Sequence, residues 1–541
     1  MQFSAQKRME NLRNYHKRKF DVIVIGGGIT GAGIALDAVT RGFKTALFEM
    51  QDFAAGTSSR STKLVHGGLR YLKQFEVKMV SEVGKERAIV YKNGPHVTTP
   101  EWMMLPIYKK GTFGKFSTSL GLYIYDYLAS VQKKERRRML TKEKTLSIEP
   151  LLKNDNLLGS GYYVEYRTDD ARLTIEVLKA AAKHGAFLSN YTKVTELIYE
   201  GNKVMGVKVK DQLKGTTYEY LAKHVVNASG PWVDDVRVLD SNNRSKSLLL
   251  TKGVHIVIDR KRFPLNNAIY FDTHDKRMIF AIPRDNKTYV GTTDTFYDDG
   301  KENPRIIDDD INYLLIAINE MFPSVLLQRK DIESSWSGLR PLIQEEGKAP
   351  SQISRKDEIW ESSSGLISIA GGKLTGYRKM AEQIVDRIIR KEKVTNACMT
   401  RNTPISGGDL EGDFTQFISK NKLKARRYGF SLEEGERLAR LYGSNVNTIF
   451  QLTDLYKKDH KNFNIPFDLF IQVLYSIKYE MAVKPSDIFV RRLGTLYFNI
   501  EKCRKYHHAI AEVMGYYLGW TEYDKERYVN ESENLILDVS F

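Results

Sequence analysis

Three glycines near the N-terminus have the spacing of a turn that binds a dinucleotide. Gly26, Gly28 and Gly31 follow the short apolar run 20–25 in the pattern Gly-x-Gly-x-x-Gly. Glycines at this spacing permit a tight turn and let a pyrophosphate approach the backbone at the positive end of a helix. Glu49 follows about 20 residues later, where a carboxylate accepts hydrogen bonds from an adenosine ribose. Together the four residues predict a dinucleotide site.

A polar segment after Glu49 distinguishes between the two common dinucleotides. Residues 57–71 read TSSRSTKLVHGGLRY, which combines hydroxyls, cations and two glycines. Such a segment can follow the far half of a cofactor, and NAD-dependent enzymes do not generally need it, so we favour FAD. The residues expected at the cofactor beyond the glycine turn and Glu49 are Thr57, Ser58, Ser59, Lys63, Gly67, Gly68, Gly230, Gly372 and Thr375.

The elements that must position these residues form a β-α-β unit. The β-branched run 20–25 predicts a buried strand, the spacing of apolar residues predicts a helix over 29–40, and a second strand is expected over 44–48. Two later apolar runs, 225–231 and 365–372, each open into a turn of small residues and are expected to join the same sheet. The fold class is therefore α/β, with a Rossmann-like FAD-binding domain assembled from residues 20–94, 140–232 and 361–395.

Two further domains are expected besides the cofactor domain. Short apolar runs separated by turn signals lie between residues 253 and 291 and predict an antiparallel sheet. We assign this sheet to a substrate domain made of residues 95–139 and 233–360. Beyond residues 404–408 the apolar residues have helical spacing, so 396–541 is expected to be an all-α C-terminal domain. Residues 1–19 form a basic N-terminal leader.

The charge balance favours an anionic partner. The chain of 541 residues has 83 Lys and Arg against 66 Asp and Glu, a formal net charge of +17. Such a surface attracts phosphorylated metabolites, nucleic acid or anionic lipid. The two cysteines form no CxxC pair, and no run of 18 apolar residues occurs. We therefore expect a cytoplasmic protein without disulfides or a spanning helix, in which any membrane contact is peripheral.

One histidine pair near the C-terminus could suggest a metal. His507-His508 has no carboxylate or cysteine at the spacing of a known ligand set. The pair fits a solvated helix face, so no metal site is expected.

Five separated motifs occur in the order of one enzyme family. They comprise residues 25–37 with Arg41-Gly42 behind them, then 66–71, 291–294, 338–342 and 371–381. On these motifs the chain resembles the FAD-dependent, aerobic glycerol-3-phosphate dehydrogenases over essentially its whole length. The resemblance implies oxidation of sn-glycerol 3-phosphate to dihydroxyacetone phosphate, with a hydride passing to FAD and electrons passing on to a membrane quinone.

The resemblance also implies a set of substrate residues. A phosphate dianion needs fixed cations, and Arg and Lys supply them as a planar fork and a compact charge. By resemblance, Arg70, Arg340, Arg355 and Lys373 lie around glycerol phosphate, with Tyr71 as a nearby hydrogen-bonding group. His is the natural base near neutral pH, and His66 and His255 both stay candidates for taking the hydroxyl proton. Arg340 or Lys373 could also stabilise the developing alkoxide charge.

Rival functions remain at this point. A glycerol-3-phosphate oxidase that uses oxygen has the same cofactor fingerprint, but its family pattern includes an inserted segment, and no long insertion is evident between Gly300 and Gly371. An amino-acid oxidase would bind carboxylate and amine instead of phosphate. A flavin-containing RNA-binding or RNA-modifying protein would cluster its cations among exposed aromatics, whereas here the charge is spread, so no nucleic-acid partner is expected.

A basic segment suggests where electrons could leave. Residues 133–138 are KKERRR and follow the apolar and aromatic stretch 120–131. This pairing is typical of a segment on a peripheral anionic membrane surface, and a solvated charged face is the alternative. The oligomeric state stays open, with a homodimer among the alternatives.

Overall fold

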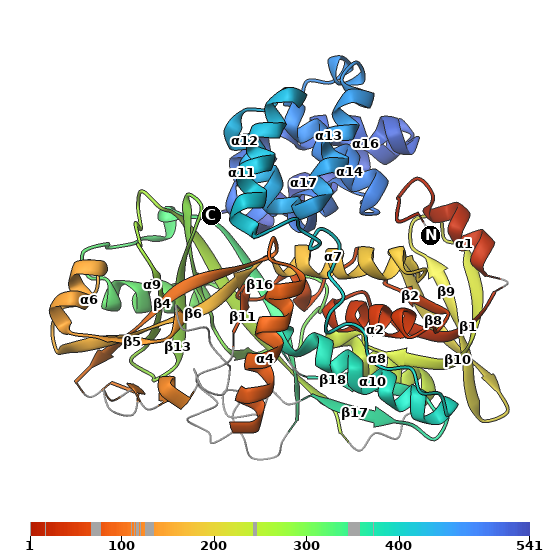
Figure 1. Ribbon diagram of the computed structural model, residues 1–541, viewed down its shortest axis with the longest axis horizontal. Coiled ribbons are helices and arrows are strands. Elements are labelled where there is room, and N and C mark those ends of the chain that lie inside the picture. Colours follow the sequence, from red (N-terminus) through yellow and green to blue (C-terminus); the bar gives the residue numbers. More distant parts are fainter. Residues whose placement is uncertain are drawn as a thin grey trace.

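The computed structural model describes residues 2–16, 18–66, 77–109, 111–112, 114, 118–119, 121–124, 135–241, 246–344, 357–371 and 373–541. It contains two sheets and a separate group of C-terminal helices, which lies above the sheets in Figure 1. The predicted fold class is confirmed.

The first sheet has the order β17-β18-β10-β1-β2-β7 and is parallel except at its β17 edge. The β8–β9 hairpin extends it antiparallel to β10. Its strands are β1 (Lys19–Ile25), β2 (Thr45–Phe48), β7 (Phe187–Ser189), β8 (Thr192–Glu200), β9 (Lys203–Asp211), β10 (Thr217–Asn227), β17 (Glu358–Glu361) and β18 (Ile367–Ala370).

Alternate residues of β1 face two different cores. Val22 and Val24 pack in a core with α2 (Ile29–Thr40), α7 (Asp170–Lys183) and α10 (Tyr377–Glu392). Ile23 and Ile25 pack in a second core on the other face. A strand covered on both faces must be apolar throughout, which is why its sequence shows a continuous run instead of an alternation. The helix expected over 29–40 has these same bounds in the structure.

The second sheet is antiparallel except where β12 meets β4, and its order is β15-β11-β14-β13-β12-β4-β6-β3. β16 pairs with β11, and β5 pairs with β6. The strands are β3 (Leu64–Val65), β4 (Thr98–Tyr108), β5 (Arg138–Leu140), β6 (Leu157–Thr168), β11 (Leu248–Asp259), β12 (Ala268–Asp272), β13 (Met278–Arg284), β14 (Lys287–Gly291), β15 (Thr295–Phe296) and β16 (Ile332–Ile343).

This sheet takes two strands from a range that the sequence suggested for the cofactor domain. β6 and β3 both pair within it, although they lie inside the ranges 140–232 and 20–94. A helix, α9 (Asp308–Met321), packs its apolar side against β11 in a third core. The domain boundaries in the sequence thus stay a prediction, while the presence of two sheets is established.

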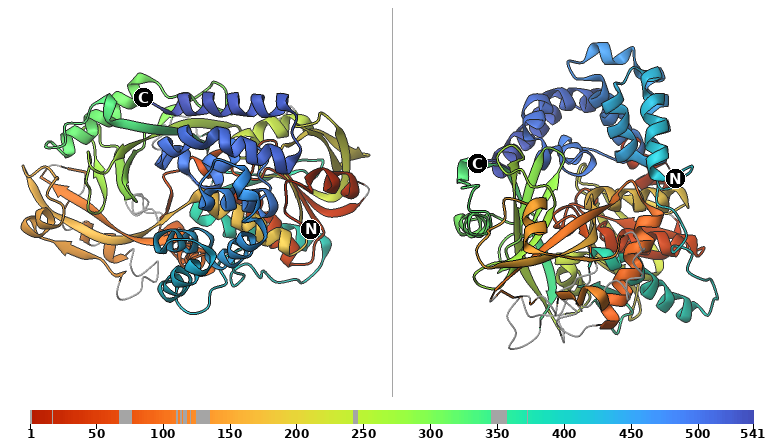
Figure 2. Two further views of the ribbon diagram at one scale, coloured as in Figure 1. Left: turned by 90° about the horizontal axis from the view of Figure 1, so that it is seen from above. Right: turned by 60° about the vertical axis from the view of Figure 1, so that its left-hand side comes forward.

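The C-terminal helices pack around an apolar core that continues into the second sheet, where Met103, Tyr289 and Trp336 belong to it. They are α11 (Phe414–Ala425), α12 (Leu432–Tyr442), α13 (Val446–Tyr456), α14 (Phe467–Tyr479), a π-helix (Asp487–Arg492), α15 (Thr495–Phe498), α16 (Ile500–Leu518) and α17 (Glu522–Val539). The remaining helices of more than one turn are α1 (Arg8–Tyr15), α4 (Val77–Asn93), α6 (Lys142–Ile148) and α8 (Val233–Asp240). In the right-hand view of Figure 2 the C-terminal helices again lie together above the sheets.

A buried ionic cluster joins the C-terminal helices to the first sheet's layer. Asp52 accepts hydrogen bonds from Arg491 and Arg492 of the π-helix, and the Arg492 Nη1–Asp52 Oδ2 distance is 2.6 Å. Glu480, after α14, accepts from Arg172 and Lys179 of α7. Burial alone would raise the pKa of Asp52, but the charges of Arg492 and Arg491 outweigh it and lower the pKa to about 2. The two bodies are therefore joined by charge as well as by apolar contact.

The N-terminal segment is part of this packing. Arg8 of α1 is buried and donates hydrogen bonds to the carbonyl of Asn190 and to Asp211 Oδ1, the latter at 2.7 Å. Leu12 is fully buried in the core beneath the first sheet. The stretch expected as a basic leader thus contributes a buried cation and an apolar side chain to the fold.

Within the described part of the chain, no helix has both the length and the apolar character needed to cross a membrane.

Candidate active site

A cavity of about 900 Å³ opens between the two sheets. The carboxyl ends of β1, β2 and β18, the start of α2 and the segment 56–66 form one part of its wall. Residues of β11 and β16 form the opposite part. In an open parallel sheet, ligands bind at the carboxyl ends of the strands, so the cavity lies where a nucleotide is expected.

The glycine turn at one end of the cavity cannot accept side chains. Gly26 has φ +108°, and a Cβ there would lie 2.6 Å from the Ala228 carbonyl oxygen. A Cβ on Gly31 would overlap the carbonyl oxygen of Gly26. Gly28 is the N-cap of α2, so the first amides of the helix face the cavity. Such amides and the helix dipole form a site for a pyrophosphate.

Glu49 is held in place by backbone donors at the end of β2. Its Oε2 accepts from the Gly27 amide at 2.7 Å and its Oε1 from the Gln51 amide at 2.9 Å. Burial raises the pKa of Glu49, and these two amides act in the opposite direction. A carboxylate oriented in this way at the cavity wall can accept hydrogen bonds from ribose hydroxyls.

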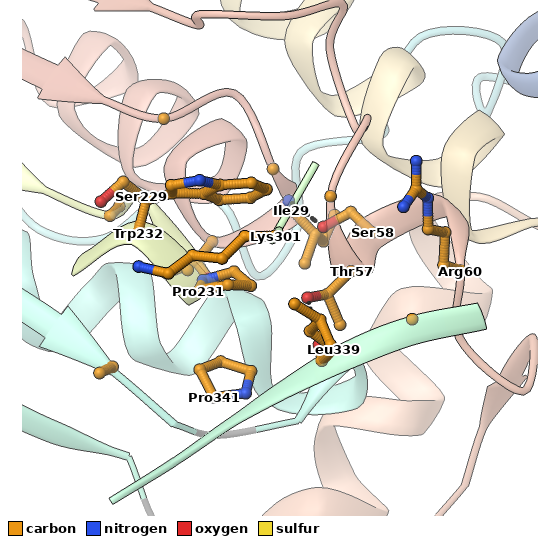
Figure 3. Close-up of a pocket in the computed structure, with 18 of the residues that line it drawn as sticks. Ile29, Thr57, Ser58, Arg60, Ser229, Pro231, Trp232, Lys301, Leu339 and Pro341 are labelled. Carbon is orange, nitrogen blue, oxygen red and sulfur yellow. Dashed lines mark hydrogen bonds between the residues drawn. The ribbon is translucent and has the colours of Figure 1, made fainter. Parts of the chain in front are cut away.

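The segment after Glu49 connects the two sides of the cavity. The Ser58 hydroxyl accepts a hydrogen bond from the Ile29 amide at 2.9 Å, drawn as a dashed line in Figure 3. Thr57 donates to the Leu339 carbonyl of β16 at 2.7 Å. Thr375 donates to the His66 carbonyl at 3.2 Å, and both residues line the cavity, as does Gly230.

Two residues expected at the cofactor lie elsewhere. Lys63 is buried and forms an ion pair with Asp170, with an Nζ–Oδ1 distance of 2.6 Å, and it also donates to the Ser59 carbonyl. Neither Lys63 nor Ser59 is among the residues that line the cavity. Their place behind the wall gives them a supporting position.

This same cavity is lined by four of the residues that are expected to act on the substrate. His66, His255, Arg340 and Lys373 come from β3's end, β11, β16 and the turn after β18. The four residues span positions 66 to 373 of the chain, so the fold brings them together. The cavity thus brings two imidazoles and two cations to one site.

Arg340 is fixed by three oxygens beside the backbone of β11. Its guanidinium donates to Thr292 Oγ1 at 2.8 Å, to the Thr293 carbonyl at 3.2 Å and to Asp294 Oδ1 at 3.1 Å. A Cβ on Gly253 would overlap the guanidinium, so a side chain at this point of β11 would displace Arg340. The motif 291–294 therefore serves to hold Arg340.

His255 is buried against Trp336. Their ring centroids are 4.8 Å apart with the planes nearly parallel, and His255 Nε2 lies 3.0 Å from Thr62 Oγ1. Burial, together with the positive charges of Arg340 and Lys63, lowers the pKa of His255 well below its ordinary value. The ring is therefore neutral at pH 7 and carries a lone pair.

Several wall residues escaped the sequence prediction. Arg60, Trp232 and Lys301 line the cavity and are labelled in Figure 3. Lys301 forms an ion pair with Asp235 at 2.7 Å, which places its stem along the wall. Burial lowers the pKa of Arg60. Arg60 stood inside the segment 57–71 and could have been found there, whereas no motif marks Trp232 or Lys301.

Other predicted residues lie outside the part of the chain that the structure describes. These are Gly67, Gly68, Arg70, Tyr71, Arg355 and Gly372.

Comparisons with known proteins identify the family of this chain. The family model described as "FAD dependent oxidoreductase" matches residues 21–378, and that of the "C-terminal domain of alpha-glycerophosphate oxidase" matches residues 398–525. The aerobic glycerol-3-phosphate dehydrogenases of Staphylococcus epidermidis and Bacillus subtilis are each 55% identical to this chain, over 98% and 99% of it and over 97% and 98% of their own lengths. The chain belongs to the family of FAD-dependent glycerol-3-phosphate dehydrogenases. The resemblance inferred from the five motifs is thereby confirmed.

A solved member of the family has the same fold. The glycerol-3-phosphate dehydrogenase from Bacillus halodurans, determined in complex with FAD, is 48% identical and superimposes with a TM-score of 0.87, covering 99% of this chain and 98% of its own. The L-alpha-glycerophosphate oxidase of Mycoplasma pneumoniae shares the fold at 18% identity and a TM-score of 0.55 over 69% of this chain.

FAD is the cofactor of this family, and the cavity fits it. The glycine turn has no room for side chains where a pyrophosphate approaches, and Glu49 is oriented by two amides beside it. The cavity's volume of about 900 Å³ falls within the usual range for ligand sites, ~300–1,000 Å³. The predicted cofactor is confirmed.

Proposed function

We propose that this chain oxidises sn-glycerol 3-phosphate to dihydroxyacetone phosphate in the cavity between the two sheets. The observation that carries the proposal is that Arg340, Lys373 and two imidazoles line the same cavity as the dinucleotide turn. When bound, FAD supplies a two-electron acceptor for the hydride that leaves C2 of the substrate.

The two cations have distinct tasks in this proposal. Arg340 presents a planar guanidinium whose orientation is set by Thr292 and Asp294, and Lys373 presents a compact charge at the turn before α10. Together they bind the phosphate dianion and stabilise negative charge at the C2 oxygen. Arg70, Tyr71 and Arg355 are proposed to complete the phosphate site on the strength of the family's motifs.

One of the two imidazoles, His66 or His255, takes the hydroxyl proton. The neutral ring of His255 has the lone pair that a base needs, and His66 lies at the end of β3 on the cavity wall. Proton transfer by a positioned side chain contributes about 10²–10⁴ in rate. The His→Gln variant at the true base should lose that factor in the rate of flavin reduction and keep its affinity for the substrate. The other variant should keep both.

For the cofactor contacts we propose the glycine turn, Glu49, Thr57, Ser58, Gly230 and Thr375 directly. Ser59 and Lys63 would act through the segment that they hold in place. Gly67, Gly68 and Gly372 are proposed from the family's motifs alone.

A membrane quinone is the proposed electron acceptor. Support comes from relatives named as aerobic dehydrogenases, which match this chain end to end at 55% identity. The oxidase from Mycoplasma pneumoniae is much more distant, at 18%.

Anaerobic stopped-flow spectroscopy tests both parts of the proposal. Glycerol 3-phosphate should bleach the yellow flavin of the holoenzyme, and a quinone should then restore the colour much faster than oxygen does. Absence of bleaching would end the substrate assignment. Faster recovery with oxygen would favour an oxidase.

We further propose that the basic segment 133–138 attaches the enzyme to the anionic cytoplasmic face of a membrane. Arg136 and Arg138 are exposed, and the rest of the segment lies partly outside the described residues. The double reversal Arg136→Glu/Arg138→Glu should release the holoenzyme from anionic vesicles in a sedimentation assay. The matched control is Arg426→Glu/Arg427→Glu, which changes the charge equally on an exposed turn after α11 and should leave binding intact. Equal binding by both variants would refute the attachment site.

A further inference from the structure

Two histidines and a carboxylate converge at the surface between the last two helices. His507 and His508 lie on α16, and Glu533 lies on α17. Glu533 Oε1 is 3.5 Å from His507 Nε2 and 3.4 Å from His508 Nε2. One ligand atom from each of the three residues lies within 4.8 Å of the other two. None of the three lines the cofactor cavity.

His507 is not on the solvated helix face that the sequence suggested. Its residue surface is only 9% exposed, whereas His508 is exposed. The reason is that α17 packs along α16 and covers this side of the helix. The helix pairing also supplies the carboxylate, which stands 25 residues beyond His508 in the sequence and so escaped a search by local spacing.

Two backbone carbonyls identify Nδ1 of His507 as a hydrogen-bond donor. Nδ1 lies 3.0 Å from the Arg504 carbonyl oxygen and 3.2 Å from that of Cys503, so Nδ1 must carry a proton to donate. In a neutral ring Nε2 then carries the lone pair. This Nε2 is buried and has no hydrogen-bond partner among the described residues. A ring held through Nδ1–H by a backbone carbonyl is the usual arrangement of a histidine that binds a metal through its other nitrogen.

The two distances from Glu533 to the imidazole nitrogens match those around a small divalent ion. Zinc binds imidazole nitrogen and carboxylate oxygen at about 2.0–2.2 Å with tetrahedral angles, so neighbouring ligand atoms lie roughly 3.3–3.6 Å apart. The two distances from Glu533 Oε1 fall in this range. A cation between them would also relieve the approach of a carboxylate oxygen to the lone pair of His507. The set of two nitrogens and one oxygen favours zinc and its neighbours over calcium or magnesium, which prefer oxygen ligands only.

We propose that His507, His508 and Glu533 form a binding site for a divalent transition metal of the zinc type that links α16 to α17. The fourth position is left to water. The site is separate from the cofactor cavity, so metal binding acts on the C-terminal helices and not on flavin chemistry.

Zinc titration of the holoenzyme tests the site directly. After treatment with a chelator and dialysis, Zn²⁺ is added in competition with a chromophoric chelator, and the bound metal is counted per flavin. The wild type should bind one zinc at this site, and His508→Ala and Glu533→Gln should each weaken that binding at least tenfold. Both side chains are exposed, and flavin content together with the metal-free melting temperature verifies that the variants fold.

A matched control is offered by another exposed histidine beside a carboxylate. His274 Nδ1 lies 3.7 Å from Glu320 Oε2, and among the described residues no third His, Cys, Asp or Glu completes a metal-binding group there. His274→Ala should therefore leave the zinc stoichiometry and affinity unchanged. Zinc should also raise the melting temperature of the wild type and of His274→Ala, but not of Glu533→Gln, because a ligand that binds only the folded state stabilises it.

Two results would overturn the proposal. One is equal zinc affinity in the wild type, His508→Ala and Glu533→Gln. The other is a zinc X-ray absorption spectrum of the loaded wild type that lacks imidazole nitrogens at about 2.0–2.1 Å.

Discussion

Replacing Asp52 with asparagine should weaken the junction between the cofactor layer and the C-terminal helices. Asp52 is 1% exposed, and both of its oxygens accept hydrogen bonds from Arg492, at 2.6 and 2.9 Å. Removing one partner of a buried ion pair costs about 3–5 kcal/mol because the remaining charge stays buried. Arg491 keeps its bond to Asp487 at 2.8 Å, so the low end of that range, about 3 kcal/mol, is expected.

The lowered pKa of Asp52 makes the stability of the same junction depend on pH. A lowering from about 3.9 in the unfolded chain to about 2 in the folded protein corresponds to roughly 2–3 kcal/mol of stability at neutral pH. Since the folded pKa is the lower one, this contribution is complete above pH 4–5 and is lost as the pH falls towards 2.

Chemical denaturation of the holoenzyme, followed by flavin release and by tryptophan fluorescence, measures the effect. Because a multidomain protein need not unfold in one step, the first transition is compared between variants. Asp52→Asn should unfold at clearly lower denaturant and release FAD earlier, since residue 52 lies three positions after Glu49. The control Asp308→Asn removes the exposed Asp308–Arg329 pair, for which ~0–1 kcal/mol is expected. Equal midpoints for the two variants would refute the reasoning.

Three other perturbations have expected outcomes. Lys373→Met should raise the dissociation constant for glycerol 3-phosphate by roughly 10–150-fold while FAD stays bound. This factor corresponds to about 1.5–3 kcal/mol for a hydrogen bond to a charged group. Unchanged affinity in a flavin titration would remove Lys373 from the site. Gly31→Ala should yield protein with little flavin, because the new methyl overlaps the Gly26 carbonyl, whereas Gly121→Ala has open space and should purify yellow. Burial lowers the pKa of His96 to about 3, so its neutral ring contributes stability that falls by about 1.4 kcal/mol per pH unit below pH 6.5. His96→Gln should flatten that slope in denaturation curves between pH 6.5 and 4, and an unaltered slope would contradict the assignment.

The sequence predicted those parts of the fold that depend on neighbours in the chain. The helix over 29–40 follows from a glycine turn and an apolar spacing that lie within one continuous segment, so its bounds could be given in advance. The strands at 253–258 and 278–282 are likewise visible as local patterns inside β11 and β13. The pairing of the strands could not be predicted in this way. β6 pairs with β4 because of contacts across the fold, and its own residues do not indicate which sheet it joins.

The site was predictable to the extent that motifs mark it. His66, Arg340 and Lys373 could be named in advance because each stands in a motif, and His255 because it stands in a predicted strand; all four line one cavity. Lys63 stood in such a pattern too, but its partner Asp170 lies 107 residues further along, and only the fold shows that the pair is closed. The carboxylate of Glu533 was hidden for the same reason. Distance in the chain, and not the type of residue, separates what could be foreseen from what could not.

The crossing of Arg340 over Gly253 has a consequence for engineering the enzyme. Two features set the position of the guanidinium. It occupies the space that a side chain at Gly253 would fill, and it donates hydrogen bonds to three oxygens of residues 292–294. Consider a library meant to accept a substrate with a different anionic group. If it varies other charged residues and keeps Gly253, Arg340 and residues 292–294, the guanidinium stays in its present position. To move it, the design must begin at Gly253, a residue with no functional side chain of its own.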